Sequence, residues 1–112
     1  MAKYVVGRVK DDNKGQLRGK KIQLIGVAYK PNVADVRETP AEQIMQELKN
    51  EGAEVTWHDP LVPEWHGEKS TKLGAEIAIV VTLHDVISKS ELEGSFDYIF
   101  DTSGKISNAV QL

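Results

Sequence analysis

Two cations near the first apolar run are the residues of this sequence best suited to binding a ligand. Lys30 and Arg37 lie in one short stretch, with Asp35 between them. Lysine and arginine bind phosphate and carboxylate groups through charge-assisted hydrogen bonds. The stretch is therefore predicted to hold an anionic ligand. A second interpretation stays open from the residues alone, because either cation could pair on the surface with Asp35, Glu38 or Asp59.

The flanking elements place this stretch at the end of a strand. Residues 22–28 form a nearly continuous apolar run, which is typical of a strand buried on both faces of a parallel sheet. A helix start follows, because Thr39 and Glu42 have the spacing of a capping box and Pro40 suits the first helical position. The connection, Tyr29 to Pro40, is longer than the about 2 to 6 residues of ordinary strand-to-helix loops. Open α/β sheets bind ligands in loops at the carboxyl ends of their strands.

The remaining pattern predicts an α/β domain. Strand, helix and strand at this spacing form a right-handed βαβ unit with parallel strands. The fold class is therefore α/β, a Rossmann-like three-layer open sheet, mostly parallel, with about four strands. We expect helices over residues 1–10, 40–51 and 86–92, strands over 22–28, 54–59, 76–83 and 96–100, an irregular connection over 60–74 and a loose end over 101–112.

Length and composition bound the function. A chain of 112 residues with 40% hydrophobic residues can build one core. The net charge of -3 predicts solubility and no general attraction to nucleic acid or to a membrane. No signal segment opens the chain, and no apolar run approaches the roughly 20 residues that span a bilayer. We therefore expect a soluble, cytoplasmic protein.

Glycine and cysteine usage exclude two kinds of chemistry. Gly26 is the only glycine near the end of the first strand, so the GxGxxG fingerprint of a dinucleotide-binding loop is absent. Side chains must therefore bind the ligand where glycine N–H groups do so elsewhere. The chain has no cysteine, which excludes disulfides and a cysteine nucleophile within these residues.

Other candidate residues are interpreted as structural. Asp59 is predicted to cap the turn at Pro60. Trp57 lies in a predicted core strand, whereas Trp65 lies in a loop and could stack on a base. The histidines have no metal-ligand spacing, so structural or exposed roles are favoured over a metal site for His58, His66 and His84.

Several of these motifs together resemble one known family. The likeness is to the C-terminal, UDP-binding domain of the UDP-glucose/GDP-mannose dehydrogenase family. It continues more weakly after Pro63, through Val80, Val81, His84 and Asp101. The paired motifs and the helix between them are specific. The matching runs are Tyr4 to Val6, Gly26 to Asn32, Asp35 to Ala41, Gly52 to Val55 and His58 to Pro63.

The resemblance implies a parent enzyme that oxidises C6 of a nucleotide sugar from alcohol to carboxylate. Such an enzyme uses two NAD molecules per substrate and a cysteine thioester intermediate. The resemblance also implies that the parent enzyme has an N-terminal NAD-binding domain and a central helical region, and that it forms a homodimer or a higher assembly. Tyr29 and Lys30 would contact the UDP portion of a UDP-sugar, with Lys30 at the diphosphate. Arg37 would reach the NAD held by the other domain. Among substrates, UDP-sugars are favoured over GDP-mannose, and UDP-N-acetylhexosamines are the closest subtype.

Three observations limit the function expected of this chain alone. Without a cysteine or a glycine fingerprint, it cannot form the thioester or hold NAD in the family's manner, so we expect it to be inactive by itself. Family members often carry an arginine after the last strand, whereas this chain has Lys105, which either substitutes as a point charge or leaves the contact absent. The first helix has no cap, which suggests a longer parent chain. We divide the sequence into a linker helix, 1–15, and the UDP-binding domain, 16–112. The alternative is a free-standing, non-catalytic nucleotide-binding or protein-interaction module.

Overall fold

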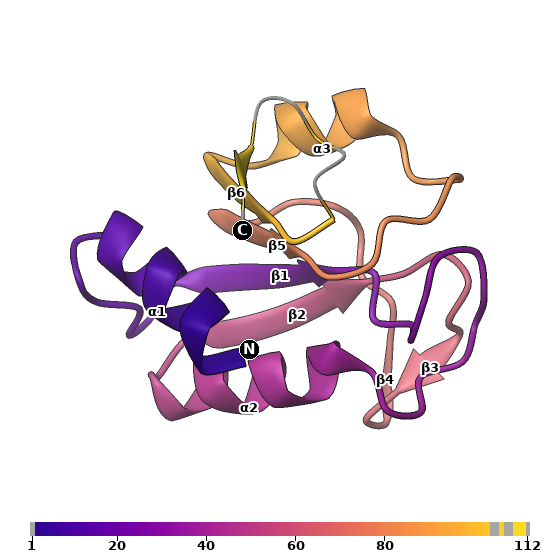
Figure 1. Ribbon diagram of the computed structural model, residues 1–112, viewed down its shortest axis with the longest axis horizontal. Helices are drawn as coiled ribbons and strands as arrows, with labels where there is room; N and C mark the ends of the chain where they lie inside the picture. The colour runs from indigo at the N-terminus through magenta and orange to yellow at the C-terminus, as the bar shows by residue number, and fades with distance from the viewer. Residues whose placement is uncertain (1, 104–105, 107–108, 112) are drawn as a thin grey trace.

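A parallel β-sheet forms the centre of the computed structural model, which describes every residue except 1, 104–105, 107–108 and 112 (Figure 1). The strand order is β2-β1-β5-β6-β7, and each neighbouring pair is parallel. The predicted α/β class and parallel sheet are confirmed. The sheet consists of β1 (Lys21–Ile25), β2 (Glu54–His58), β5 (Ile77–Val80), β6 (Tyr98–Asp101) and the two-residue β7 (Val110–Gln111).

Helices cover both faces of the sheet and give it three layers. The helices α1 (Ala2–Asp12) and α2 (Pro40–Asn50) lie on one face, and α3 (Lys89–Ser95) lies on the other (Figure 1). Alternate residues of the strands feed the two resulting cores. On the first face, Ile22 and Leu24 pack with the helices; on the second, Ile25 packs with α3. β1 is therefore buried on both sides, as its apolar run predicted.

One polar residue interrupts that buried strand. Gln23 is fully buried, and its side chain lies on the α3 face of β1. Its amide nitrogen donates to Thr71 Oγ1 and to the carbonyl of Lys72, both at 2.7 Å, and its carbonyl oxygen accepts from Gly74 N at 3.1 Å. The segment 71–74 thus lies over Gln23 on this face of the sheet. The Gln23 side chain forms hydrogen bonds with main-chain groups of Lys72 and Gly74 in that segment.

The same segment covers the outer edge of β2 at Trp57. Thr71 N donates to the carbonyl of Trp57 at 2.9 Å, and the Thr71 hydroxyl donates to the same oxygen at 2.8 Å. His58 Nδ1 lies 2.7 Å from the carbonyl of Thr71. Because His58 O accepts from Gly26 N on the β1 side, the Trp57 carbonyl points away from the sheet. Residue 71 therefore takes the place that a further strand would occupy.

Helix α2 begins and ends where the sequence indicates. The Thr39 side chain accepts from Ala41 N at 3.2 Å, and Pro40 occupies the first turn. The capping box itself is not closed, because the carboxylate of Glu42 contacts His66 Nε2 instead of the Thr39 N–H. At the other end Gly52 has a φ of +84°, and the helix ends in a Schellman-type pair of hydrogen bonds.

The connection after β2 is more ordered than the sequence predicted. Residues 60–74 contain a hairpin of β3 (Glu64–Trp65) and β4 (Glu68–Lys69). Trp65 is only 7% exposed and meets Trp57 edge-on, with ring centroids 5.8 Å apart at 89°. The base-stacking role considered for Trp65 is wrong, because its indole belongs to the core.

Helix α1 packs on this domain. Its buried side belongs to the same hydrophobic core as the buried side of α2 and consists of Val5, Val6 and Val9, with Ala2. The hydroxyl of Tyr98 on β6 donates to Asp12 Oδ2 at 2.7 Å and so attaches the end of the helix to the sheet. The apolar side of the predicted first helix therefore faces this domain. A domain boundary near residue 15 stays a prediction.

The last third differs in detail from the prediction. Helix α3 begins after an N-cap at Ser88, later than the predicted start at residue 86. The expected loose end contributes β7, which pairs with β6, and Ile106, which is buried. Lys105 lies outside the described residues. Within the described part of the chain, no helix is long and apolar enough to cross a membrane.

Candidate functional site

Gly26 turns the chain out of β1 and begins the loop that carries the predicted site. Its φ is +75°, and its N–H donates to the carbonyl of His58 at 2.8 Å. A Cβ built on Gly26 would lie 1.7 Å from the carbonyl oxygen of Thr82. Only glycine allows the two backbone segments, at residues 26 and 82, to approach this closely. The single glycine at the strand end therefore serves packing between the β1 and β5 loops.

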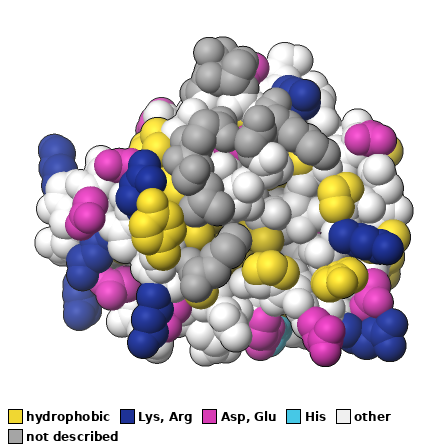
Figure 2. Space-filling view, in the orientation of Figure 1, with side chains coloured by type: hydrophobic (Ala, Val, Ile, Leu, Met, Phe, Trp, Pro, Cys, Tyr) yellow, Lys and Arg dark blue, Asp and Glu magenta, His cyan; other side chains and the backbone are white. Residues whose placement is uncertain are grey.

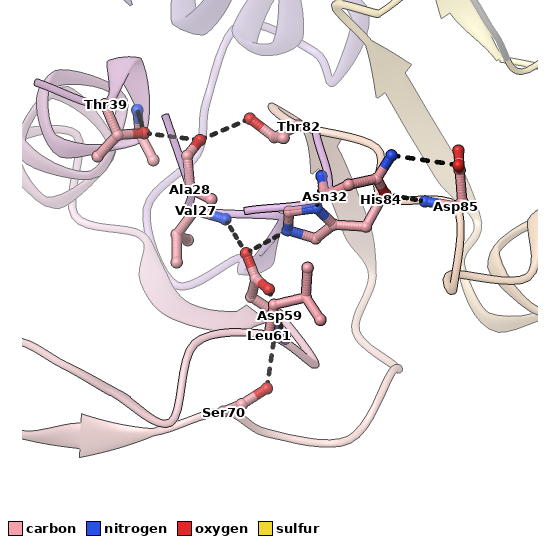
Figure 3. Close-up of polar contacts among 11 residues, drawn as sticks. Val27, Ala28, Asn32, Thr39, Asp59, Leu61, Ser70, Thr82, His84 and Asp85 are labelled. Carbon is pink, nitrogen blue, oxygen red and sulfur yellow. Dashed lines mark hydrogen bonds and ion pairs between the residues drawn. The ribbon is translucent and has the colours of Figure 1, made fainter. Parts of the chain in front are cut away.

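Backbone contacts then close the loop on itself. The carbonyl of Ala28 accepts from the hydroxyl of Thr82 at 2.7 Å and from that of Thr39 at 3.3 Å (Figure 3). Tyr29 N donates to the carbonyl of Asp35 at 2.7 Å. The start of the loop is thereby joined to its own end and to the neighbouring loop, so residues 29–35 form a closed turn rather than a loose connection.

Asn32 joins this turn to the loop that follows β5. It is a left-handed residue, with a φ of +66°. Its N–H donates to His84 Nδ1 at 2.8 Å. Its side chain pairs with Asp85, donating to Oδ2 at 3.1 Å and accepting from the Asp85 N–H at 2.9 Å (Figure 3). Three hydrogen bonds thus fix the tip of the loop.

A buried carboxylate lies beneath the same turn. Asp59 follows β2 and is fully buried. Its Oδ2 accepts from Val27 N and from His84 Nε2, each at 2.9 Å, and its Oδ1 accepts from Leu61 N at 2.9 Å (Figure 3). The contact with Leu61 caps the turn at Pro60, as predicted. The other two contacts link the carboxyl ends of the three adjacent strands β2, β1 and β5.

The topology explains why these loops meet. The connection from β1 through α2 to β2 uses one face of the sheet, and the connection from β5 through α3 to β6 uses the other. The strand order reverses between β1 and β5. Open α/β sheets bind ligands outside the carboxyl ends of the strands at this reversal. The predicted loop lies there.

The structure pairs one of the two predicted cations. Arg37 Nη2 lies 2.8 Å from Asp35 Oδ2, and Arg37 Nε and N both donate to Asp35 Oδ1. These hydrogen bonds lower the pKa of the Asp35 carboxyl to about 2. They also raise the pKa of the Arg37 guanidinium. The Arg37 side chain remains 87% exposed, so the pair holds the guanidinium without covering it.

The predicted residues are only partly brought together. Tyr29, Asp35, Arg37 and Glu38 line an open hollow of about 530 Å³. Lys30 is exposed and is not part of that lining, and it makes no hydrogen bond or ion pair with any residue the structure describes. Tyr29 is 51% exposed. The hollow therefore offers an aromatic ring and a cation, with a second cation adjacent along the chain.

Among the residues that the structure describes, no metal site competes with this hollow. Among the described residues, no group of histidines, aspartates and glutamates could hold a metal ion. Figure 2 shows one face of the molecule, on which basic and acidic side chains are interspersed rather than separated by sign.

Comparison with known proteins decides the family. A family model described as "UDP-glucose/GDP-mannose dehydrogenase family, UDP binding domain" matches residues 23–107, which is most of the chain. The chain belongs to this family. The match includes the loop from Tyr29 to Pro40 and both buried partners, Asp59 and His84. The resemblance drawn from the sequence motifs is confirmed.

Individual relatives of this UDP-binding domain are much longer proteins. The domain is 46% identical over 46 residues to UDP-glucose 6-dehydrogenase of Rhizobium meliloti, and this match covers 41% of the chain and 10% of the relative. The domain is 29% identical over 116 residues to UDP-N-acetyl-D-mannosamine dehydrogenase of Methanocaldococcus jannaschii, and this match covers 100% of the chain and 26% of the relative. The solved UDP-N-acetyl-mannosamine dehydrogenase Cap5O of Staphylococcus aureus matches with a TM-score of 0.72 and 28% identity, covering 96% and 28%. The domain thus spans about a quarter or less of each.

Sequence reasoning missed the residues that support the loop of this UDP-binding domain. The structural role expected for His84 agrees with its burial, but its partners Asn32 and Asp59 are not predicted from the sequence. Asn32 and His84 are distant in sequence, and no periodic pattern joins them. The available signal was the asparagine itself, since asparagine tolerates left-handed backbone better than most residues. The hydrogen bonds of Asp59 to Val27 and His84 had no such signal.

Proposed function

We propose that this domain binds the UDP portion of a UDP-sugar within a larger, NAD-dependent nucleotide-sugar 6-dehydrogenase. That enzyme would oxidise the C6 alcohol of the sugar to a carboxylate. The observation that carries the proposal is the hollow beside the closed turn 29–35, at the strand reversal of a domain that belongs to the UDP-binding family. The chain by itself is proposed to bind without catalysis, since it contains no cysteine to form a thioester.

Lys30 is proposed to contact the diphosphate. Its ammonium group is exposed and makes no contact with a described carboxylate, so it can approach an anion without breaking an ion pair. Tyr29, the neighbouring residue, presents a half-exposed ring at the edge of the hollow. A phenol ring offers both an apolar face and a hydroxyl to a nucleoside. These two residues together suit the UDP portion of the ligand.

Arg37 is proposed to contact NAD held by another domain. The guanidinium is largely exposed, and Asp35 holds it through two hydrogen bonds, while a third comes from the Arg37 backbone N–H. A preorganised guanidinium loses less conformational entropy when it binds a phosphate. The chain has no glycine fingerprint of its own for NAD, so the dinucleotide must be held mainly by a domain outside it. The N-terminal and central domains of the parent enzyme are therefore the proposed partners, in a homodimer or a higher assembly.

A UDP-sugar is favoured over GDP-mannose as the substrate. The relatives named above are UDP-glucose and UDP-N-acetylmannosamine dehydrogenases. The matches that extend over nearly the whole chain include the UDP-N-acetylmannosamine enzymes. An N-acetylhexosamine is therefore the proposed sugar.

Calorimetric titration with UDP tests the proposal. We expect weak, millimolar-range binding to the 112-residue chain, because in the proposed enzyme other domains would supply part of the contacts to the nucleotide sugar. Lys30→Ala should weaken binding by roughly tenfold, as loss of a charge-assisted hydrogen bond does. Arg37→Ala should leave UDP affinity nearly unchanged. Lys3→Ala, which removes an exposed charge on α1, is the matched control. Absence of binding by the wild-type chain, or loss of binding in Arg37→Ala but not in Lys30→Ala, would contradict these roles.

A further inference from the structure

We infer that His84 is a positioning residue for nucleotide binding, because it holds the turn that presents Lys30. This inference rests on the proposed function of the loop. His84 is fully buried beneath the turn, so it acts through Asn32 rather than by touching a ligand. Its partner on the other side, Asp59, is fully buried as well. The pair crosses the carboxyl end of β1 and joins the loops after β2 and β5.

The hydrogen bonds fix the tautomer of His84. Because the Asn32 N–H donates to Nδ1 at 2.8 Å, Nδ1 must carry a lone pair. The proton of the neutral ring is therefore on Nε2, which donates to Asp59 Oδ2 at 2.9 Å. Asp59 in turn accepts from Val27 N. The carboxylate thus orients the ring, and the ring supplies the acceptor that the loop requires.

Lys30 depends on this acceptor through the geometry of the turn. Pro31 follows Lys30 directly, and Asn32 is left-handed, with a φ of +66°. A left-handed asparagine costs free energy that surrounding contacts must offset. The N–H of Asn32 is one of those contacts, and the side-chain pairing with Asp85 supplies the others. Without an acceptor at Nδ1, the Asn32 N–H would be left unpaired in a partly buried site.

Two substitutions separate the two functions of the ring. In His84→Asn, the side-chain oxygen can occupy the place of Nδ1 and accept from Asn32, while the contact with Asp59 is lost. In His84→Gln, the amide nitrogen can occupy the place of Nε2 and donate to Asp59, while the contact with Asn32 is lost. His84→Ala removes both. Ile44→Val is the stability control, because Ile44 is a fully buried residue of α2 that is outside the loop.

The test combines UDP calorimetry, thermal melting and amide hydrogen exchange of Asn32 in the 112-residue chain. His84→Asn should keep the Asn32 amide protected and bind UDP within about threefold of wild type, whereas His84→Gln and His84→Ala should lose that protection and bind roughly tenfold more weakly. Ile44→Val should lower the melting temperature at unchanged UDP affinity. In the wild type, nitrogen-15 spectra of the imidazole should show the proton on Nε2.

Three outcomes would overturn the inference. The first is wild-type affinity in His84→Gln, and the second is a proton on Nδ1 in the wild-type spectrum. The third is a loss of UDP affinity in Ile44→Val as large as that in His84→Ala, which would make the effect one of stability alone. If the wild-type chain binds no UDP, the proposed function fails first and this inference falls with it. If the wild type binds and only the His84 pattern fails, the proposed function stands.

Discussion

Gly26→Ala should destabilise this domain far more than an alanine at another glycine with the same φ angle. Gly26 and Gly19 both have a φ of +75°. A Cβ at Gly19 would meet no atom within 4 Å, whereas a Cβ at Gly26 would lie 1.7 Å from the carbonyl oxygen and 2.7 Å from the carbonyl carbon of Thr82. The two substitutions therefore share the backbone cost and differ in the steric cost.

The magnitude follows from these two terms. An alanine in the left-handed region costs about 1 kcal/mol, which is the full effect expected for Gly19→Ala. At Gly26 the backbone of Thr82 must also move, which disturbs the buried hydrogen bond from its hydroxyl to the carbonyl of Ala28. Overpacking and the lost hydrogen bond together add about 2 to 4 kcal/mol. Gly26→Ala should therefore lower the free energy of unfolding by about 3 to 5 kcal/mol, a large share of the stability of an ordinary domain.

Urea unfolding of the wild type and the two variants measures this difference. For 112 residues, each kcal/mol corresponds to a shift of about 4 °C in melting temperature. Gly19→Ala should therefore melt about 4 °C below the wild type, and Gly26→Ala should melt at least about 12 °C below it or fail to fold. Equal free energies of unfolding for the two variants would refute the argument, because the contact between Gly26 and Thr82 would then have no energetic effect.

Three further substitutions test other contacts. Because Arg37 lowers the pKa of Asp35 from 3.8 to about 2, Asp35 stabilises the fold above pH 3.8 and loses that contribution as the pH falls through about 2. Arg37→Ala should return this pKa toward 3.8 in a carbon-13 titration, and an unchanged midpoint would contradict the pairing. Trp65→Ala should cost about 3 kcal/mol in urea unfolding while leaving UDP affinity unchanged, since the indole is buried in the core. Burial and the hydrogen bond to Asp12 raise the pKa of Tyr98 above its ordinary value of 10.0. Tyr98 therefore contributes fully to the free energy of unfolding below pH 10.0, and this contribution falls as the pH rises further. Tyr98→Phe should cost about 1 kcal/mol at neutral pH and weaken the alkaline loss of stability; a wild-type pH profile in this variant would exclude the contact.

Local signals explain how much of the fold could be predicted. Helix α2 was found because Thr39, Pro40 and Gly52 mark its ends with residues whose backbone chemistry is specific. The buried strands were found because apolar runs of this kind fit a parallel sheet. The sequence pattern predicts a helix start at residue 86, whereas α3 begins after Ser88, whose side chain accepts from Glu91 N in the spacing of a capping box. The start of a short helix is decided by its cap.

The remaining differences come from contacts that no local pattern records. The hairpin after β2 has strands of two residues each, too short for an alternating pattern to appear. Trp65 of this hairpin packs on Trp57 of β2, a contact that depends on how the turn at Pro60 folds back. In the candidate site, the position of the loop was predicted from strand topology, and the pairing of Arg37 with Asp35 was one of two open alternatives. The position of the His84 ring beneath the loop could not be predicted, because its contacts join residues that are far apart in the sequence.

The segment that covers β2 has a consequence for how this protein associates. An open sheet edge is a template onto which a strand from another molecule can add, and this is a common route to aggregation. Here a strand approaching β2 would first have to displace Thr71 from the carbonyl of Trp57, and with it the contacts that Gln23 makes. Addition of a strand from another molecule is therefore opposed where Thr71 covers Trp57 on β2.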